Sequence, residues 1–250
     1  MVAQEFTVDL NKPLVFQVGH LGEAYEEWVH QPIASREGPR FFESDFWEFL
    51  TRTVWWVIPV VWLPVVCWFV SISLRMGHTV PHVAQMVALG IFIWTLIEYI
   101  LHRFLFHIKT KSYWANTFHY LIHGCHHKHP MDGLRLVFPP AAAAVLCVPF
   151  WNMVKFFSTP STTPALFGGG LLGYVMYDVT HYYLHHGQPI SNLPRSLKAS
   201  EHDFTELAID ILFLYKSSCF LQDCLLLRCI FLCCKTNFLG LSAFVTAYPL

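Results

Sequence analysis

A stretch of 22 residues without a charged side chain, TVWWVIPVVWLPVVCWFVSISL, lies between Arg52 and Arg75. A helix of this length crosses the apolar core of a bilayer, and membrane helices tolerate internal prolines such as Pro59 and Pro64. The composition agrees, because 54% of the residues are hydrophobic and only 13% are charged. A soluble domain usually carries about 25% charged residues. We therefore expect an all-α integral membrane protein.

Three more apolar runs predict three further transmembrane helices. One covers about 83–101, one lies between Arg135 and Lys155, and one begins near Pro164 and continues into DVTHYYLHH. The second and the fourth span carry ionisable groups at their C-terminal ends. Four transmembrane helices return the chain to the side on which the first one starts.

Basic residues are distributed unevenly between the two sides of these spans. They gather before the first span, between the second and third, and after the fourth, at Lys12, Arg36, Arg40, Arg52, Arg103, Lys109, Lys111, Lys128, Arg135, Arg195 and Lys198. The short loops on the other side hold only Arg75 and Lys155. The positive-inside rule therefore places the N-terminus, residues 102–135 and the region after 181 in the cytosol. The net charge of −1 offers no basic surface for nucleic acid.

Histidine is concentrated in the segments that are predicted to face the cytosol. Seven of the 15 histidines lie between His102 and His129, and three more lie in HYYLHH, residues 181–186. Because residues three or four apart share one face of a helix, two groups of rings are expected to converge: His123, His126 and His127, and His181 and His185. The five-residue spacing of His102 and His107 suits a helix end that runs into a loop.

A cluster of neutral imidazoles is typical of a site for zinc, iron or copper. One zinc ion takes three or four ligands, so seven imidazoles favour two metal ions in a histidine-rich cytosolic cap. Two alternatives remain. The histidines could be surface residues that bind no metal, or they could form a proton relay. The isolated histidines are interpreted as surface residues: His20, His30, His78 and His82. His119 and His129 either hydrogen-bond to the ligands or face solvent, and His186 points away from His185.

The segments HRFLFH, HGCHHKHPMD and YDVTHYYLHH resemble the histidine boxes of the fatty acid hydroxylase superfamily, which is related to the sterol desaturases. FFESDFWEFLTRTVWW, LRLVFPP and the region around the boxes are similar to plant fatty acid 2-hydroxylases. These enzymes hydroxylate C2 of the very-long-chain acyl group of ceramide or dihydroceramide in sphingolipid synthesis. The resemblance runs from residue 1 to about 198.

The resemblance implies a monooxygenase of the endoplasmic reticulum membrane that uses O2 and electrons from cytochrome b5. It implies two metal ions, zinc or iron, and carries the family's ligands over to His102, His107, His123, His126, His127, His181 and His185. It assigns no catalytic residue beyond these ligands. No His-Pro-Gly-Gly haem motif precedes the first span, so cytochrome b5 is expected as a separate partner and no haem is expected in this chain.

The resemblance ends near Lys198. The family pattern requires one more H-x-x-H-H box, whereas residues 199–250 contain the single histidine His202. We therefore expect three parts: a cytosolic N-terminal segment, 1–52; a hydroxylase membrane domain without its final histidine box, 53–198; and a divergent tail, 199–250, which a splice or frameshift product would explain.

Three other functions remain open from the sequence. The first is a catalytically inactive variant that acts only by assembling with partners. The second is another hydroxylase of the superfamily, of the sterol or wax type. The third is a metal transporter.

Overall fold

The computed structural model describes residues 7–35 and 37–187, and the predicted divergent tail lies outside these ranges. Every regular element in the described ranges is helical. The elements are, in chain order, η1 (Val18–Ala24), α1 (Tyr25–Val29), α2 (Asp45–Leu50), α3 (Val57–Arg75), α4 (Val80–Leu101), η2 (His102–Phe106), α5 (Tyr113–His119), η3 (Tyr120–Gly124), α6 (Cys125–Lys128), α7 (Pro140–Phe157) and α8 (Thr163–His186). The element η1 is a 3₁₀-helix, and η2 and η3 are π-helices.

The four long helices lie where the apolar runs predict them. Three segments are long and apolar enough to cross a membrane: Val57–Arg75, Val80–Phe106 and Pro140–Phe157. Helix α8 is not among them, because polar and ionisable residues such as Asp178 and His181 occupy its C-terminal turns. The prediction of an all-α membrane protein is supported, and the fourth span stays a prediction.

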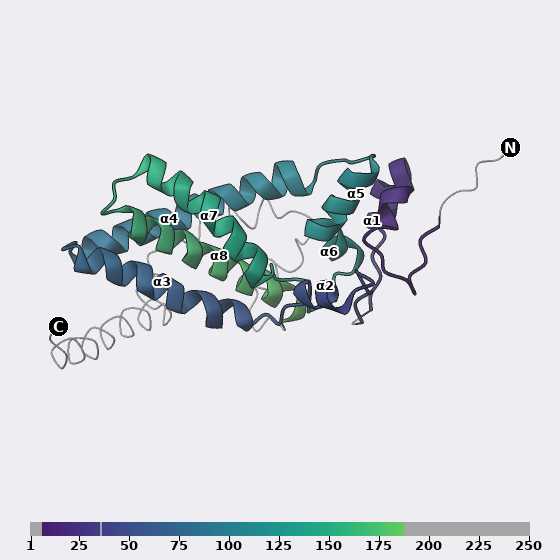
Figure 1. Cartoon of the computed structure of the whole chain (residues 1–250), viewed down its shortest axis with the longest axis horizontal. Coiled ribbons are helices and arrows are strands. Elements are labelled where there is room, and N and C mark those ends of the chain that lie inside the picture. Colours follow the sequence, from purple (N-terminus) through teal and green to yellow (C-terminus); the bar gives the residue numbers. More distant parts are fainter. Residues whose placement is uncertain (1–6, 36, 188–250) are drawn as a thin grey trace. The chain divides into compact units, whose positions relative to one another are not determined.

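The described residues form two compact units, one of which holds residues 59–97 and 146–177. In this unit α3, α4 and α7 run alongside α8 (Figure 1). Phe167 of α8 contacts the rings of Phe69 and Phe150, with ring centroids 4.9 and 5.5 Å apart. Tyr174, two turns later, contacts Trp62 and Trp94. These edge-to-face and tilted ring contacts pack α8 against the neighbouring helices of this unit.

Small residues let α4 and α8 approach closely within the same unit. A Cβ atom added to Gly169 would collide with the backbone of Val87, and one added to Gly90 would collide with the backbone of Leu166. Membrane helices commonly pack through such small residues. Lipid is as apolar as the side chains, so helix association depends on close van der Waals contact between backbones instead of on the hydrophobic effect.

Gly169→Val is expected to destabilise this helix pair, because its side chain has no room against Val87. Overpacking of this kind costs about 1–3 kcal/mol. Thermal unfolding in detergent measures the change. Ala144→Val introduces a valine at an exposed position of α7 and serves as the control. Equal melting temperatures for both variants would contradict the close packing.

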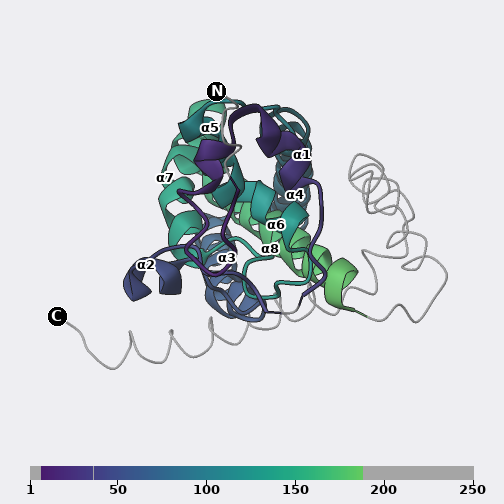
Figure 2. The same cartoon turned by 90° about the vertical axis from the view of Figure 1, so that its right-hand side faces the viewer.

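The other unit holds residues 7–58, 98–145 and 178–187 within the described ranges. Its core joins the N-terminal segment to the segment α5–η3–α6, seen together in Figure 2. The buried members of this core are Leu14, Val15, Val18, Tyr25, Val29, Phe41, Tyr120 and Cys125. The N-terminal segment therefore folds onto the residues that carry His123, His126 and His127, the central histidine group.

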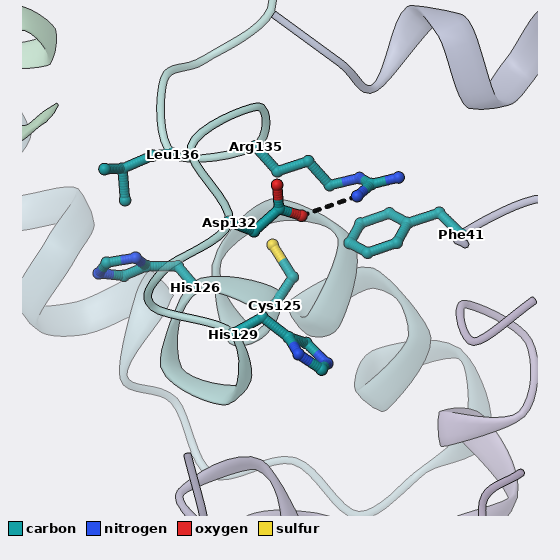
Figure 3. Close-up of a pocket in the computed structure, with 7 residues that line it drawn as sticks. All are labelled: Phe41, Cys125, His126, His129, Asp132, Arg135 and Leu136. Atoms are coloured by element: carbon teal, nitrogen blue, oxygen red, sulfur yellow. Dashed lines mark hydrogen bonds and ion pairs between the residues drawn. The ribbon is translucent and has the colours of Figure 1, made fainter. Parts of the chain in front are cut away.

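A buried ion-pair network fixes the loop that follows this histidine group. Arg135 pairs with both Glu48 and Asp132, and the Nη1–Oδ2 distance to Asp132 is 2.7 Å (Figure 3). The backbone N–H groups of Phe41 and Phe42 donate to the Glu48 carboxylate at 2.8 and 3.0 Å. Burial alone would raise the pKa of Glu48, but these two N–H groups and Arg135 hold it below its ordinary value of 4.5.

Glu48→Gln is expected to lower the free energy of unfolding by about 3 kcal/mol at pH 7, because it leaves Arg135 buried with less negative charge beside it. The contribution of Glu48 is complete above pH 4.5 and disappears as the pH falls through the lower pKa of the folded state.

Thermal unfolding at pH 7 and below pH 4.5 tests both parts of this expectation. The wild type should lose more stability than Glu48→Gln as the pH falls. Lys12→Gln breaks the exposed pair with Asp9 and should change little. Parallel pH curves for wild type and Glu48→Gln would show that the carboxylate is not stabilised in this way.

Candidate metal centre

The π-helix η2 brings His102 and His107 together. A π-helix closes its hydrogen bonds between residues five apart, so side chains at this spacing meet on one side. The ring centroids of His102 and His107 are 4.6 Å apart. The five-residue spacing matches the i→i+5 hydrogen bonds of the π-helix. The helix ends at Phe106 and a loop follows His107, as the spacing suggested.

The elements η3 and α6 carry the central group, His123, His126 and His127. His123 lies in η3 and faces His102 and His107, at centroid distances of 5.1 and 5.4 Å. His127 lies one helical turn later, and its Nε2 is 3.0 Å from Nε2 of His123. The central group thus adjoins the pair from η2.

Helix α8 supplies the third group from its last turns. The rings of His181 and His185 lie 4.8 and 4.5 Å from the ring of His126. Nε2 of His181 lies 3.4 Å from Nε2 of His126. All seven rings that the sequence singles out are therefore linked by contacts within one unit of the structure.

The nitrogen atoms have the spacing that a shared metal ion requires. Three sets of histidines have ligand atoms within 4.8 Å of one another: His102, His107 and His123; His126, His181 and His185; and His30, His107 and His127. Two nitrogens bound to one tetrahedral ion at about 2.0–2.1 Å lie roughly 3.3 Å apart. The separation of 3.4 Å between Nε2 of His126 and Nε2 of His181, which belong to one set, matches this value. The donor set therefore fits two ions of the kind that imidazole prefers.

Burial keeps the central imidazoles neutral, as metal ligands must be. It lowers the pKa of His127 to about 3, with the rings of His107 and His30 as further causes. It also holds the pKa values of His123 and His126 well below 6.5, again helped by neighbouring imidazoles. Among the described residues, Nδ1 of His126 is buried without a hydrogen-bond partner. At pH 7 this group therefore presents lone pairs rather than charges.

His119 links the N-terminal segment to the end of η2. The Tyr25 hydroxyl donates to Nδ1 of His119 at 2.7 Å, and Nε2–H of His119 donates to the carbonyl oxygen of Phe106 at 2.7 Å. Both ring nitrogens are thus engaged, and His119 is 4% exposed. The ring is therefore not solvated, and its hydrogen bonds go to Tyr25 and Phe106 rather than to the predicted ligands. His119 positions the backbone beside His107.

Tyr25→Phe is expected to lower the free energy of unfolding by about 1–3 kcal/mol, because Nδ1 of His119 would stay buried without a donor. Thermal unfolding in detergent measures the loss. Tyr113→Phe is the matched control, since no hydrogen bond of the Tyr113 hydroxyl is found within the described residues. Similar melting temperatures for the two variants would show that the bond from Tyr25 contributes little.

A small pocket lies beside the central histidines, lined by Phe41, Cys125, His126, His129, Asp132, Arg135 and Leu136 (Figure 3). His129 is 6% exposed, and neither ring nitrogen has a partner among the described residues. Burial lowers the pKa of His129 to about 4 and raises that of the Cys125 thiol to about 12. His129 is therefore buried rather than solvated, and Cys125 stays a protonated thiol.

The remaining histidines divide into two kinds. His20, His78, His82 and His186 belong to none of the three candidate sets in the described part of the chain. His186 stacks on Tyr182 with centroids 4.6 Å apart. His30, which the sequence interprets as a surface residue, is indeed exposed, and its ring also lies 5.0 Å from the ring of His127. No local pattern marks His30, because long-range packing brings it there.

Comparisons with known proteins identify the family. A family model described as fatty acid hydroxylase matches residues 87–206. A dihydroceramide fatty acyl 2-hydroxylase of Arabidopsis thaliana is 74% identical over 198 residues, which cover 79% of this chain and 84% of that protein. The chain belongs to the fatty acid hydroxylase family. The resemblance stated from the histidine boxes is confirmed.

Other members of the family agree. Human fatty acid 2-hydroxylase is 44% identical over 202 residues, which cover 73% of this chain and 54% of that protein. A solved structure of full-length scs7p, in which only the hydroxylase domain is visible, matches with a TM-score of 0.73 at 39% identity. It covers 79% of this chain and 76% of that one. As a fatty acid hydroxylase, the chain is assigned to the oxidoreductases.

Proposed function

We propose that the chain is a membrane monooxygenase that hydroxylates C2 of very-long-chain acyl groups of ceramide or dihydroceramide. The observation that carries the proposal is the convergence of seven imidazoles from η2, η3–α6 and α8 in a chain 74% identical to a dihydroceramide fatty acyl 2-hydroxylase. The reaction inserts one oxygen atom of O2 into a C2–H bond. The other oxygen atom takes up two electrons and two protons and leaves as water.

Two sets of residues would hold a metal pair, of zinc or iron. His126, His181 and His185 form one set, and the histidines around His107 form the other: His102, His107, His123 and His127. Iron bound there supplies the activation of O2, whereas zinc is redox-inert. Burial keeps His123, His126 and His127 neutral. His119 and the ion pairs of Arg135 hold the backbone around them in place.

Membrane orientation follows from the basic residues. α8 acts as the fourth transmembrane helix, and the histidine-rich cap lies on the cytosolic face of the endoplasmic reticulum membrane. The acyl tail of the substrate lies in the apolar phase and its polar head in water. Reach from the headgroup, rather than recognition of the carbon atom, then selects C2. A separate cytochrome b5 delivers the two electrons.

Expression in a cell that lacks its own fatty acid 2-hydroxylase tests this function. The chain should restore 2-hydroxy acyl chains in sphingolipids, measured by mass spectrometry. His126→Ala should reduce the product at least tenfold, because the ring of His126 contacts His181 and His185 as well as His123 and His127. Changes outside the ligands themselves already weaken metal sites by about 10–100-fold. His20→Ala, outside the candidate sets, should behave as wild type.

The same experiment separates the alternatives. Hydroxylated sterols or wax precursors in place of 2-hydroxy acyl chains would support another superfamily hydroxylase. The inactive variant is favoured by one observation, the single histidine His202 after residue 198. It predicts no product from a chain that is expressed and folded. A separate experiment tests the third alternative, because metal uptake into reconstituted vesicles would support a transporter.

A further inference from the structure

A hydrogen-bonded anchor holds the segment that carries His30 against α6. The ammonium group of Lys128 donates to the carbonyl oxygens of Trp28 and Gln31 at 2.9 and 2.7 Å. It also lies 4.4 Å from the centre of the Trp28 ring, in the geometry of a cation–π contact. The backbone N–H of Ile33 donates to the carbonyl oxygen of Lys128 at 2.8 Å. His30 therefore sits in a segment tied at several points to the residue after His127.

The orientation of the His30 ring is set by a second hydrogen bond. Nδ1 of His30 lies 2.8 Å from the backbone oxygen of Glu26. A carbonyl oxygen can only accept, so Nδ1 carries the proton and Nε2 of the neutral ring keeps its lone pair. Metal-bound histidines are oriented in the same way, because a hydrogen bond from one ring nitrogen fixes the tautomer and directs the other nitrogen to the metal.

Two rings of the metal centre lie beside His30. His30, His107 and His127 have ligand atoms within 4.8 Å of one another. The ring of His127 lies between the other two, with centroid distances of 5.0 Å to His30 and 5.1 Å to His107. These separations resemble those within the two groups of expected ligands, such as 5.1 Å between His181 and His185.

We propose that His30 is a further ligand of the metal ion held by His107 and His127. The inference rests on the proposed metal centre and adds a ligand from outside the histidine boxes. An N-terminal imidazole would complete the coordination of this ion from the described part of the chain. The final H-x-x-H-H box that the family pattern requires is represented after residue 198 only by His202.

The test uses the affinity of the purified full chain for Co²⁺, measured by competition with a chelator in detergent. His30→Ala should weaken the binding of one of two Co²⁺ ions at least tenfold, because even changes outside the ligand shell cost about 10–100-fold. The visible absorption of that ion should change with its coordination. His20→Ala removes a histidine outside the candidate sets and is the matched control.

Two further variants separate a ligand from a merely structural residue. A glutamate at this position can bind a metal ion but cannot donate to the Glu26 carbonyl, whereas a glutamine can donate but is a poor metal ligand. His30→Glu should therefore regain affinity and His30→Gln should not.

Recovery by His30→Gln instead of His30→Glu, or an affinity of His30→Ala equal to that of His20→Ala, would overturn the inference. A wild-type chain that binds no Co²⁺ would overturn the proposed metal centre itself, which is a different result.

Discussion

Seven imidazole rings from three separate segments lie in mutual contact, with neighbouring centroids between 4.5 Å and 5.7 Å apart. Such a cluster is stable only while the rings are neutral. Two protonated rings about 5 Å apart would repel each other by roughly 3 kcal/mol at an effective dielectric constant of about 20. Burial prevents protonation of His123, His126 and His127. The same burial makes these rings good metal ligands, so the fold and the chemistry depend on one condition.

The chain meets this condition by assembling the cap from segments that are distant in sequence. The core of the unit places the N-terminal segment on α5 and α6. Tyr25 then fixes His119, and Lys128 fixes the loop around His30. The buried pair of Glu48 and Arg135 holds the loop after the central histidines. Polar residues outside the histidine boxes thus maintain the position of the boxes.

Much of this arrangement is readable in the sequence. Uncharged runs predict the long helices, and the spacing of three or four residues predicts that His123, His126 and His127 share a face. Two features follow from other physics. A five-residue spacing alone does not predict that His102–Phe106 form a π-helical turn, because the spacing does not determine the local backbone geometry. The approach of His30 depends on Lys128, about 100 residues away in the chain, and no periodic pattern encodes such a contact.

The central claim is that these imidazoles hold two metal ions. Metal content per chain of the purified protein, measured by elemental analysis together with protein concentration, tests this claim most directly. We expect close to two ions of iron or zinc to remain in each chain after loosely bound metal has been removed. A content well below one would contradict it and would mean that the converging rings do not form a metal centre.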